Sequence, residues 1–122
     1  MKRALLVEDH ALFREGLMLL LRWRMGMESV EAGSLAEGRR ALSDPKSVAD
    51  VAIINIDLPD GDGSELIEQL HKAKPDVPVL ALTADRGLVR RARALEAGAD
   101  EVLAKTTPVE QIIDAVRQLR HA

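Results

Sequence analysis

The sequence predicts an α/β protein with a doubly wound, five-stranded parallel sheet. Residues 4–7, 51–54 and 79–82 are continuously apolar, as strands are when helices cover both faces of their sheet. Longer segments of helical period alternate with these runs. Short connections between successive strands and helices imply parallel pairing with helices on both faces of the sheet.

Each element can be placed in chain order. Weaker apolar runs at residues 29–32 and 101–104 complete the set of strands, and helices are expected at residues 11–25, 35–43, 64–74, 87–97 and 109–120. Ser34 followed by Glu37 fits a capping box at the second helix start. Gly26 suits a left-handed end of the first helix.

Composition limits the class of protein. A chain of 122 residues suggests one domain, residues 1–122, and it has no cysteine for disulfides or thiolate metal sites, which fits a cytoplasmic location. The net charge of −3 gives no general attraction to nucleic acid, and aromatic residues make up only 2%, too few for base stacking. Each apolar run is too short for a membrane span, so no membrane association is expected.

Polar side chains follow the predicted strands at their carboxyl ends. Glu8 and Asp9 end the first strand, Asn55 the third, Thr83 the fourth and Lys105 the fifth. In open parallel sheets, ligands bind beyond this edge. Carboxylate and amide oxygens suit Mg²⁺, whereas a lysine and a hydroxyl suit a phosphoryl group.

The chain resembles the receiver domains of bacterial two-component response regulators over essentially its whole length. The resemblance rests on short motifs in order: Val7-Glu8-Asp9-His10, Leu58-Pro59 with Gly63, Leu82-Thr83-Ala84, Ala97-Gly98-Ala99-Asp100 and Lys105-Thr106-Thr107-Pro108. The opening VEDHALFREGL is most similar to the subgroup whose receivers precede a LuxR-type DNA-binding domain.

The resemblance implies a flavodoxin-like (βα)5 fold with strand order 2-1-3-4-5, and a role in phosphorelay signalling that regulates transcription. It implies Mg²⁺ bound by Asp9 directly, by Glu8 through water and by the backbone carbonyl of Asp57. Thr83 would contact the phosphoryl group, and Lys105 would pair with the acceptor or its phosphate. The implied partners are a sensor histidine kinase, a second copy of the chain, and DNA only through a domain outside this chain.

The residue at the acceptor position departs from the family. Receivers carry an aspartate four residues before the loop proline, where this chain has Asn55. A neutral amide lacks the anionic oxygen that attacks phosphorus, so we expect no phosphorylation there, weaker Mg²⁺ binding and a resting, inactive conformation. The intact neighbours fit either an introduced aspartate-to-asparagine change or a natural receiver that still uses its pocket. The amide oxygen remains a candidate metal ligand.

The loop after the third strand holds three more acids. Asp57, Asp60 and Asp62 are interpreted as solvated turn residues, with Asp62 also capping the next helix. The side chain of Asp57 is expected to point away from the pocket, which disfavours it as a substitute acceptor. An EF-hand loop starting at Asp60 is disfavoured because Glu65 would replace the required glycine.

Two further features lie outside the strand ends. Arg86, Arg90 and Arg93 share one helix face, interpreted as solvated in preference to a docking surface. Val102 stands where receivers usually have an aromatic residue that moves with the threonine, so coupling to the site is expected to differ.

Three functions are compatible with these features of the sequence. The first is a signalling receiver whose usual acceptor is absent, and which is not an enzyme. The alternative is a phosphorylation-independent pseudo-receiver that acts by docking to proteins. A Mg²⁺-dependent phosphatase is least favoured, because Asn55 occupies the natural place for its nucleophile and no glycine-rich phosphate loop is present.

Overall fold

A five-stranded sheet forms the centre of the computed structural model, which describes residues 2–84 and 87–120. Its order is β2-β1-β3-β6-β7, and every neighbouring pair is parallel. The strands are β1 (Arg3–Val7), β2 (Glu28–Ala32), β3 (Val51–Asn55), β6 (Val79–Thr83) and β7 (Glu101–Ala104). Counted along the chain, this is the predicted order 2-1-3-4-5, so the flavodoxin-like fold is confirmed.

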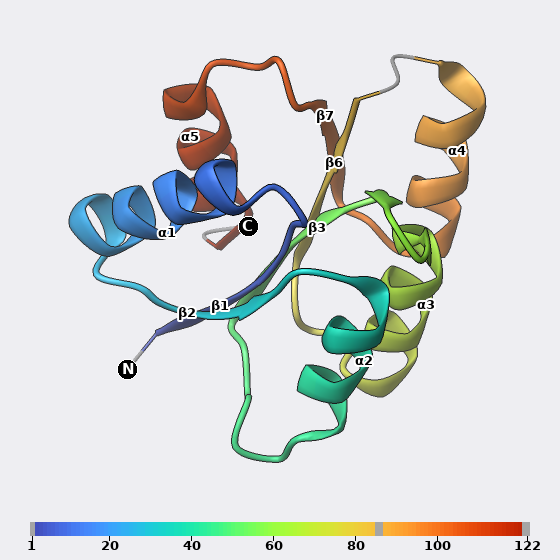
Figure 1. The fold of residues 1–122 in the computed structure, drawn as a ribbon, viewed down its shortest axis with the longest axis horizontal. Helices are drawn as coiled ribbons and strands as arrows, with labels where there is room; N and C mark the ends of the chain where they lie inside the picture. The colour runs from blue at the N-terminus through green and yellow to red at the C-terminus, as the bar shows by residue number, and fades with distance from the viewer. Residues whose placement is uncertain (1, 85–86, 121–122) are drawn as a thin grey trace.

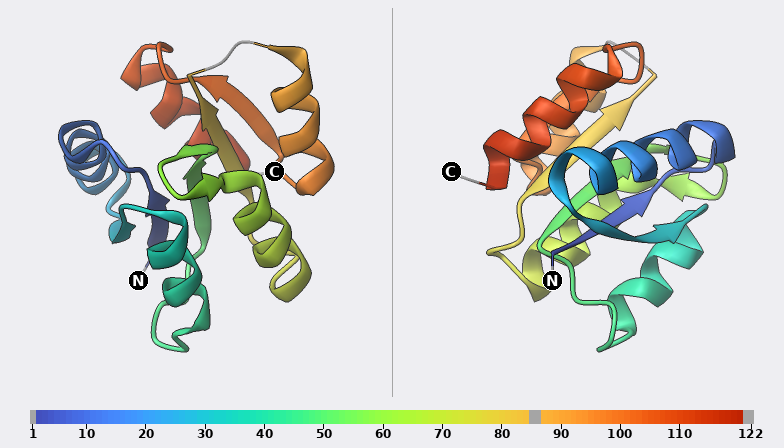
Figure 2. Two further views of the ribbon diagram at one scale, coloured as in Figure 1. Left: turned by 45° about the vertical axis from the view of Figure 1, so that its right-hand side comes forward. Right: turned by 90° about the vertical axis from the view of Figure 1, so that its left-hand side faces the viewer.

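Helices cover both faces of the sheet (Figures 1 and 2). One face carries α1 (Ala11–Met25) and α5 (Val109–Arg120), and the other carries α2 (Leu35–Ser43), α3 (Gly63–Ala73) and α4 (Leu88–Ala97). The bounds differ from those expected by one residue in α3 and α4, because Lys74 and Gly87 are caps. No helix in the described ranges is long and apolar enough to cross a bilayer.

The sheet separates two apolar layers. In β1, Leu5 and Val7 belong to the layer under α2, α3 and α4, whereas Leu6 packs with Leu17 and Ile112 under α1 and α5. The continuous apolar runs in the sequence follow from this arrangement, because successive side chains of a strand enter opposite layers. Full burial of each such leucine or isoleucine contributes about 1.5–3 kcal/mol.

The predicted helix ends form with one variation. Ser34 Oγ accepts a hydrogen bond from the Glu37 backbone N–H at 3.1 Å. The Glu37 carboxylate accepts from the backbone N–H of Gly33 at 3.1 Å, one residue earlier than in a capping box. Gly26 ends α1 with φ 62°, the left-handed conformation expected of it.

A small hairpin that the sequence did not predict follows β3. Strands β4 (Asp57–Leu58) and β5 (Gly61–Asp62) pair antiparallel, with Asp57 opposite Asp62. Asp62 caps α3 as expected, by accepting a hydrogen bond from Ser64 N at 2.8 Å. Asp60 is not a free turn residue: its carboxylate accepts from Leu35 N at 2.8 Å and from Ala36 N at 3.0 Å, and so ties the hairpin to the start of α2.

The contact between α3 and β3 allows a sharp test of packing. A Cβ added to Gly63 would lie 2.3 Å from the backbone oxygen of Asn55 and 2.8 Å from Ile56 Cα. Backbone atoms cannot relieve such a clash by changing rotamer. Gly63→Ala is therefore expected to lower the free energy of unfolding by about 1–3 kcal/mol, measured by urea denaturation.

Gly16→Ala is the matched control for this prediction. An added Cβ there meets nothing within 4 Å, and Gly16 lies in the interior of α1. Removing a glycine from a helix interior is expected to raise stability by about 0.5–1 kcal/mol. Equal stability of Gly63→Ala and the parent chain would contradict the close approach.

The Asp60 contacts predict a pH dependence of stability. The N–H groups of Leu35 and then Ala36 donate to its carboxylate and hold the pKa of Asp60 below its ordinary value. A lowered pKa in the folded state adds stability above the unfolded pKa, and this is lost as pH falls through the folded pKa. Asp60→Asn should therefore lower the urea midpoint at pH 7, with the deficit shrinking below about pH 4. A deficit independent of pH would oppose this assignment.

Candidate functional site

The carboxyl ends of the parallel strands form one edge of the sheet (Figure 1), and the polar residues predicted at the strand ends lie at this edge. Glu8 and Asp9 follow β1, Asn55 and Thr83 are the last residues of β3 and β6, and Lys105 follows β7. Four of them form one cluster, in which Asn55 donates to Glu8 and Asp9 while Lys105 pairs with Glu8. The Thr83 hydroxyl is directed instead to the hairpin after β3.

Asn55 is held in one orientation. Its side-chain nitrogen donates to Glu8 Oε2 at 2.6 Å and to Asp9 Oδ1 at 3.1 Å, with the Asp57 carbonyl oxygen 3.5 Å away. Its side-chain oxygen accepts from the Asp57 backbone N–H at 3.0 Å. Exchanging the two atoms would set an oxygen against three acceptors and a nitrogen against a donor, so the network fixes the assignment.

Glu8 is the most deeply buried charge of the site, with 0% of its surface exposed. Lys105 Nζ forms an ion pair with Glu8 Oε1 and lies 5.1 Å from the centroid of the Phe13 ring. Arg14 Nη1 donates to the Glu8 backbone oxygen at 2.6 Å. The resemblance placed Lys105 against residue 55, but the lysine pairs with Glu8, because Glu8 carries the charge that the neutral amide lacks.

The arrangement does not fit a directly bound Mg²⁺. The oxygens that the resemblance assigns to the metal belong to Glu8, Asp9 and the Asp57 backbone, and the Asn55 nitrogen lies among them. The amide hydrogens of Asn55 repel a cation, and they already bind the oxygen lone pairs that a metal ion would need. The amide oxygen of Asn55 faces the Asp57 N–H and not the other oxygens. Over the described parts of the chain, no three acidic or histidine side chains are grouped so that they could hold a metal ion.

The Asp57 side chain points toward the end of β6, which corrects the expectation that it points away. Its Oδ2 accepts from Thr83 Oγ1 at 3.0 Å and from the Ala84 backbone N–H at 2.7 Å. Thr83 is itself only 3% exposed. The direction of this side chain depends on the hairpin, whose two-residue strands leave no periodic signal in the sequence.

Helix α4 presents its arginines to the same hairpin. Arg90 Nη1 lies 2.5 Å from Asp57 Oδ1, and Arg93 Nε lies 3.2 Å from Asp62 Oδ2. The side chains of Arg90 and Arg93 remain 40% and 62% exposed, so this face is solvated as interpreted, and the ion pairs with the hairpin are a feature that the sequence did not predict. Arg86 lies outside the described residues. The sequence shows these aspartates and arginines, but it does not show which of them pair, because the pairing depends on the hairpin that carries Asp57 and Asp62.

Val102 is part of the apolar core, with 1% of its surface exposed. Its carbonyl oxygen accepts a hydrogen bond from Arg91 Nη1 at 3.0 Å. Val102 belongs to the apolar layer that also contains Ala81 of β6 and Ala94 of α4, and it has no ring to exchange between inner and outer positions. The expected difference in coupling at this position stays a prediction.

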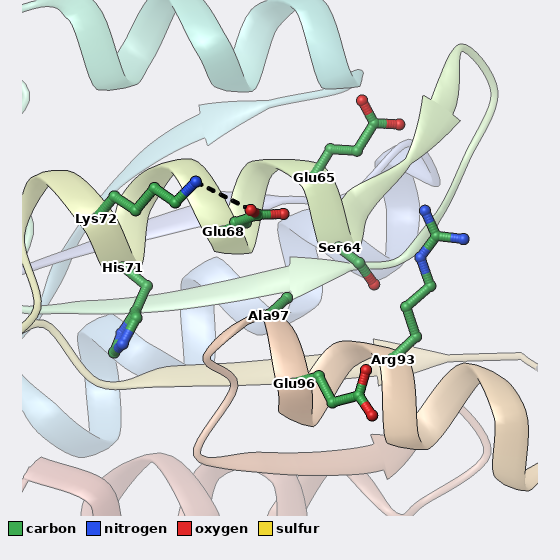
Figure 3. A pocket seen from close by; sticks show the side chains of 8 residues that line it. All are labelled: Ser64, Glu65, Glu68, His71, Lys72, Arg93, Glu96 and Ala97. Carbon is green, nitrogen blue, oxygen red and sulfur yellow. Dashed lines mark ion pairs between the residues drawn. The ribbon is translucent and has the colours of Figure 1, made fainter.

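A groove of about 430 Å³ lies between α3 and α4, away from the strand-end cluster (Figure 3). Glu68 and Lys72 of α3 form an ion pair of 3.1 Å at its wall, and Arg93 of α4 faces the start of α3. Residues at the ends of β1, β3, β6 and β7 do not line it. Nothing in the sequence marked this groove, because it arises where two amphipathic helices pack side by side.

The fold and site define a doubly wound α/β protein with its polar centre at the carboxyl edge of the sheet. Residues 4–117 match the family model described as response regulator receiver domain. The chain belongs to this family, whose members are signalling modules that interact with sensor kinases.

Individual relatives agree with this membership. The virulence transcriptional regulatory protein PhoP of Salmonella typhimurium is 33% identical over 119 residues, which are 98% of this chain and 52% of that protein. The chain thus spans about half the length of this curated relative. A CheY-like receiver domain protein from Methanospirillum hungatei has a TM-score of 0.91 at 26% identity, covering 99% of this chain and 94% of that one.

A two-component response regulator of the LuxR family from Aurantimonas is a further structural relative. Its TM-score is 0.85 at 26% identity, with 98% of this chain and 84% of that chain covered.

The buried ion pair can be tested by removing its cation. Lys105→Met leaves the buried Glu8 carboxylate without a facing ammonium, and we expect a loss of about 3 kcal/mol in unfolding free energy by urea denaturation. Glu8→Gln in the same background should recover part of this loss, because the uncompensated charge is then gone. Strict additivity of the two substitutions in a double-mutant cycle would contradict the pairing.

Proposed function

We propose that this chain is the receiver domain of a two-component response regulator and does not accept a phosphoryl group at position 55. Membership of the family supports the first part. The second is carried by one observation, the Asn55 amide with its nitrogen directed at Glu8 and Asp9. A phosphoryl acceptor needs an anionic oxygen free to attack phosphorus. Here the residue in that place is neutral, its nitrogen lone pair is delocalised, and its oxygen accepts from the Asp57 N–H.

Weak Mg²⁺ binding follows from the same contacts. A cation between Glu8 and Asp9 would have to displace the Asn55 N–H groups and compete with Lys105 for Glu8. The Lys105 ammonium compensates the charge of Glu8, and the Asn55 amide donates hydrogen bonds to both carboxylates. We infer that a divalent ion would be bound more weakly here than in a pocket with a third carboxylate and without the amide N–H groups.

The regulatory context is proposed from the relatives. The PhoP relative is a transcriptional regulatory protein about twice as long as this chain, and the opening VEDHALFREGL is similar to the LuxR subgroup, to which the Aurantimonas relative belongs. We infer a sensor histidine kinase as upstream partner and control of transcription as output. Contact with DNA would then belong to a domain outside this chain, and self-association to the receiver.

A phosphorylation-independent docking module is the alternative, and two observations favour it. Two carboxylates of the site are already paired with cations of the same chain, Glu8 with Lys105 and Asp57 with Arg90. Helix α4 also exposes Leu88 and Val89 to solvent. Such a domain would present a fixed surface to a partner and would need no phosphodonor.

Intact-mass measurement separates these functions. The chain and its Asn55→Asp variant are incubated with Mg²⁺ and a small phosphodonor such as acetyl phosphate. We expect a phosphoryl adduct on the variant alone, because only the variant offers a carboxylate at the end of β3. In the same samples, Mg²⁺ should raise the Tm of the variant more than that of the parent chain, since binding to the folded state stabilises it.

Each other outcome has a distinct meaning. An adduct mapped to position 55 of the parent chain would refute the proposal. An adduct on both proteins at another carboxylate would reveal a second acceptor. No adduct on either protein would favour the docking module.

A further inference from the structure

The Asp57 carboxylate occupies a set of anion-binding donors at the end of β6. Thr83 Oγ1 and the Ala84 N–H donate to Oδ2, at 3.0 and 2.7 Å, and Arg90 Nη1 lies 2.5 Å from Oδ1. A hydroxyl, a backbone N–H and a guanidinium are the donor types that hold phosphoryl oxygens. Both oxygens of Asp57 are engaged, so another anion could use these donors only by displacing it.

The hairpin fixes Asp57 in this place. Its backbone N–H donates to the Asn55 side-chain oxygen at 3.0 Å, and it lies opposite Asp62 in the β4–β5 pair. Asp62 in turn caps α3 and pairs with Arg93. Two aspartates of one hairpin therefore contact two arginines one turn apart on α4, but only Asp57 also contacts the end of β6.

We propose that the Asp57 carboxylate is a built-in substitute for a phosphoryl group, which joins the end of β6 to α4 through Thr83, Ala84 and Arg90. The position of α4 is then set within the chain and needs no phosphodonor. The inference rests on the proposed function, because a phosphoryl group carried at position 55 would compete for the same donors.

Hydrogen exchange tests the link to α4. Asp57→Ala removes the acceptor for all three donors, and we expect exchange of the Ala84 amide and of the amides of α4 to quicken about tenfold without any phosphodonor. Asp62→Asn is the matched control, because it removes the Arg93 ion pair of the same hairpin and keeps a side chain that can cap α3. Its effect on the Ala84 amide should be negligible.

A second pair of variants keeps the test independent of hairpin folding. Arg90→Gln leaves Asp57 bound to Thr83 and Ala84, so exchange should quicken in α4 while the Ala84 amide stays protected. Arg93→Gln, one turn further along the helix, should change the exchange of α4 less than Arg90→Gln does. Unchanged exchange in both Asp57→Ala and Arg90→Gln would overturn the inference.

Competition for the donors gives a further measurement. With Mg²⁺ present, beryllium fluoride serves as a stable phosphoryl analogue on the carboxylate of the Asn55→Asp variant. Adding Asp57→Ala to that variant should raise its apparent affinity about tenfold, because the internal competitor is gone. Equal affinities would contradict the inference. Phosphorylation of the parent chain at position 55 would refute the proposed function alone, and the exchange of the unphosphorylated protein would still decide the role of Asp57.

Discussion

The burial of the Glu8 carboxylate is the constraint on which the site depends. β1 lies between β2 and β3, so the residue that follows it is enclosed, and Glu8 is 0% exposed. A buried charge is tolerated only when it is paired and hydrogen-bonded. Lys105 supplies the opposite charge and Asn55 donates the hydrogen bond. Residues at the ends of β7 and β3 therefore both bind the Glu8 carboxylate. The asparagine is thus an integral part of the electrostatics of the pocket.

Because these residues bind one another, the polar side chains at the carboxyl edge form two separate groups. Glu8, Asn55 and Lys105 form the inner group, and Asp57 with Arg90 forms the outer group beside Thr83. The backbone of Asp57 connects them, because its N–H donates to the Asn55 side chain. An acid two residues beyond the end of β3 therefore contacts Thr83, the hydroxyl that the resemblance assigns to a phosphoryl group. Family membership alone would not have indicated this contact.

The sequence predicted the sheet, the helices and the strand-end residues because each leaves a local pattern. Continuous apolar runs marked the buried strands, and cap residues such as Ser34 and Gly26 marked helix ends to within a residue. The hairpin of β4 and β5 was not predictable in this way, since two-residue strands have no periodicity. The direction of the Asp57 side chain depends on residues 26 and 27 positions away in the chain, at the end of β6. Only the folded arrangement brings those donors to it.

The division of the interior into two apolar layers also separates two properties of the protein. Asp57 and Arg90 belong to elements on the side of α2, α3 and α4, whereas α1 and α5 pack on the opposite side of the sheet. Substitutions around Leu17 or Ile112 can thus change the melting temperature of the domain without changing the solvent-exposed surface of α4. Because the β-sheet lies between the two layers, mutations can accumulate in one layer to change stability while the α4 surface, which a partner would contact, is conserved.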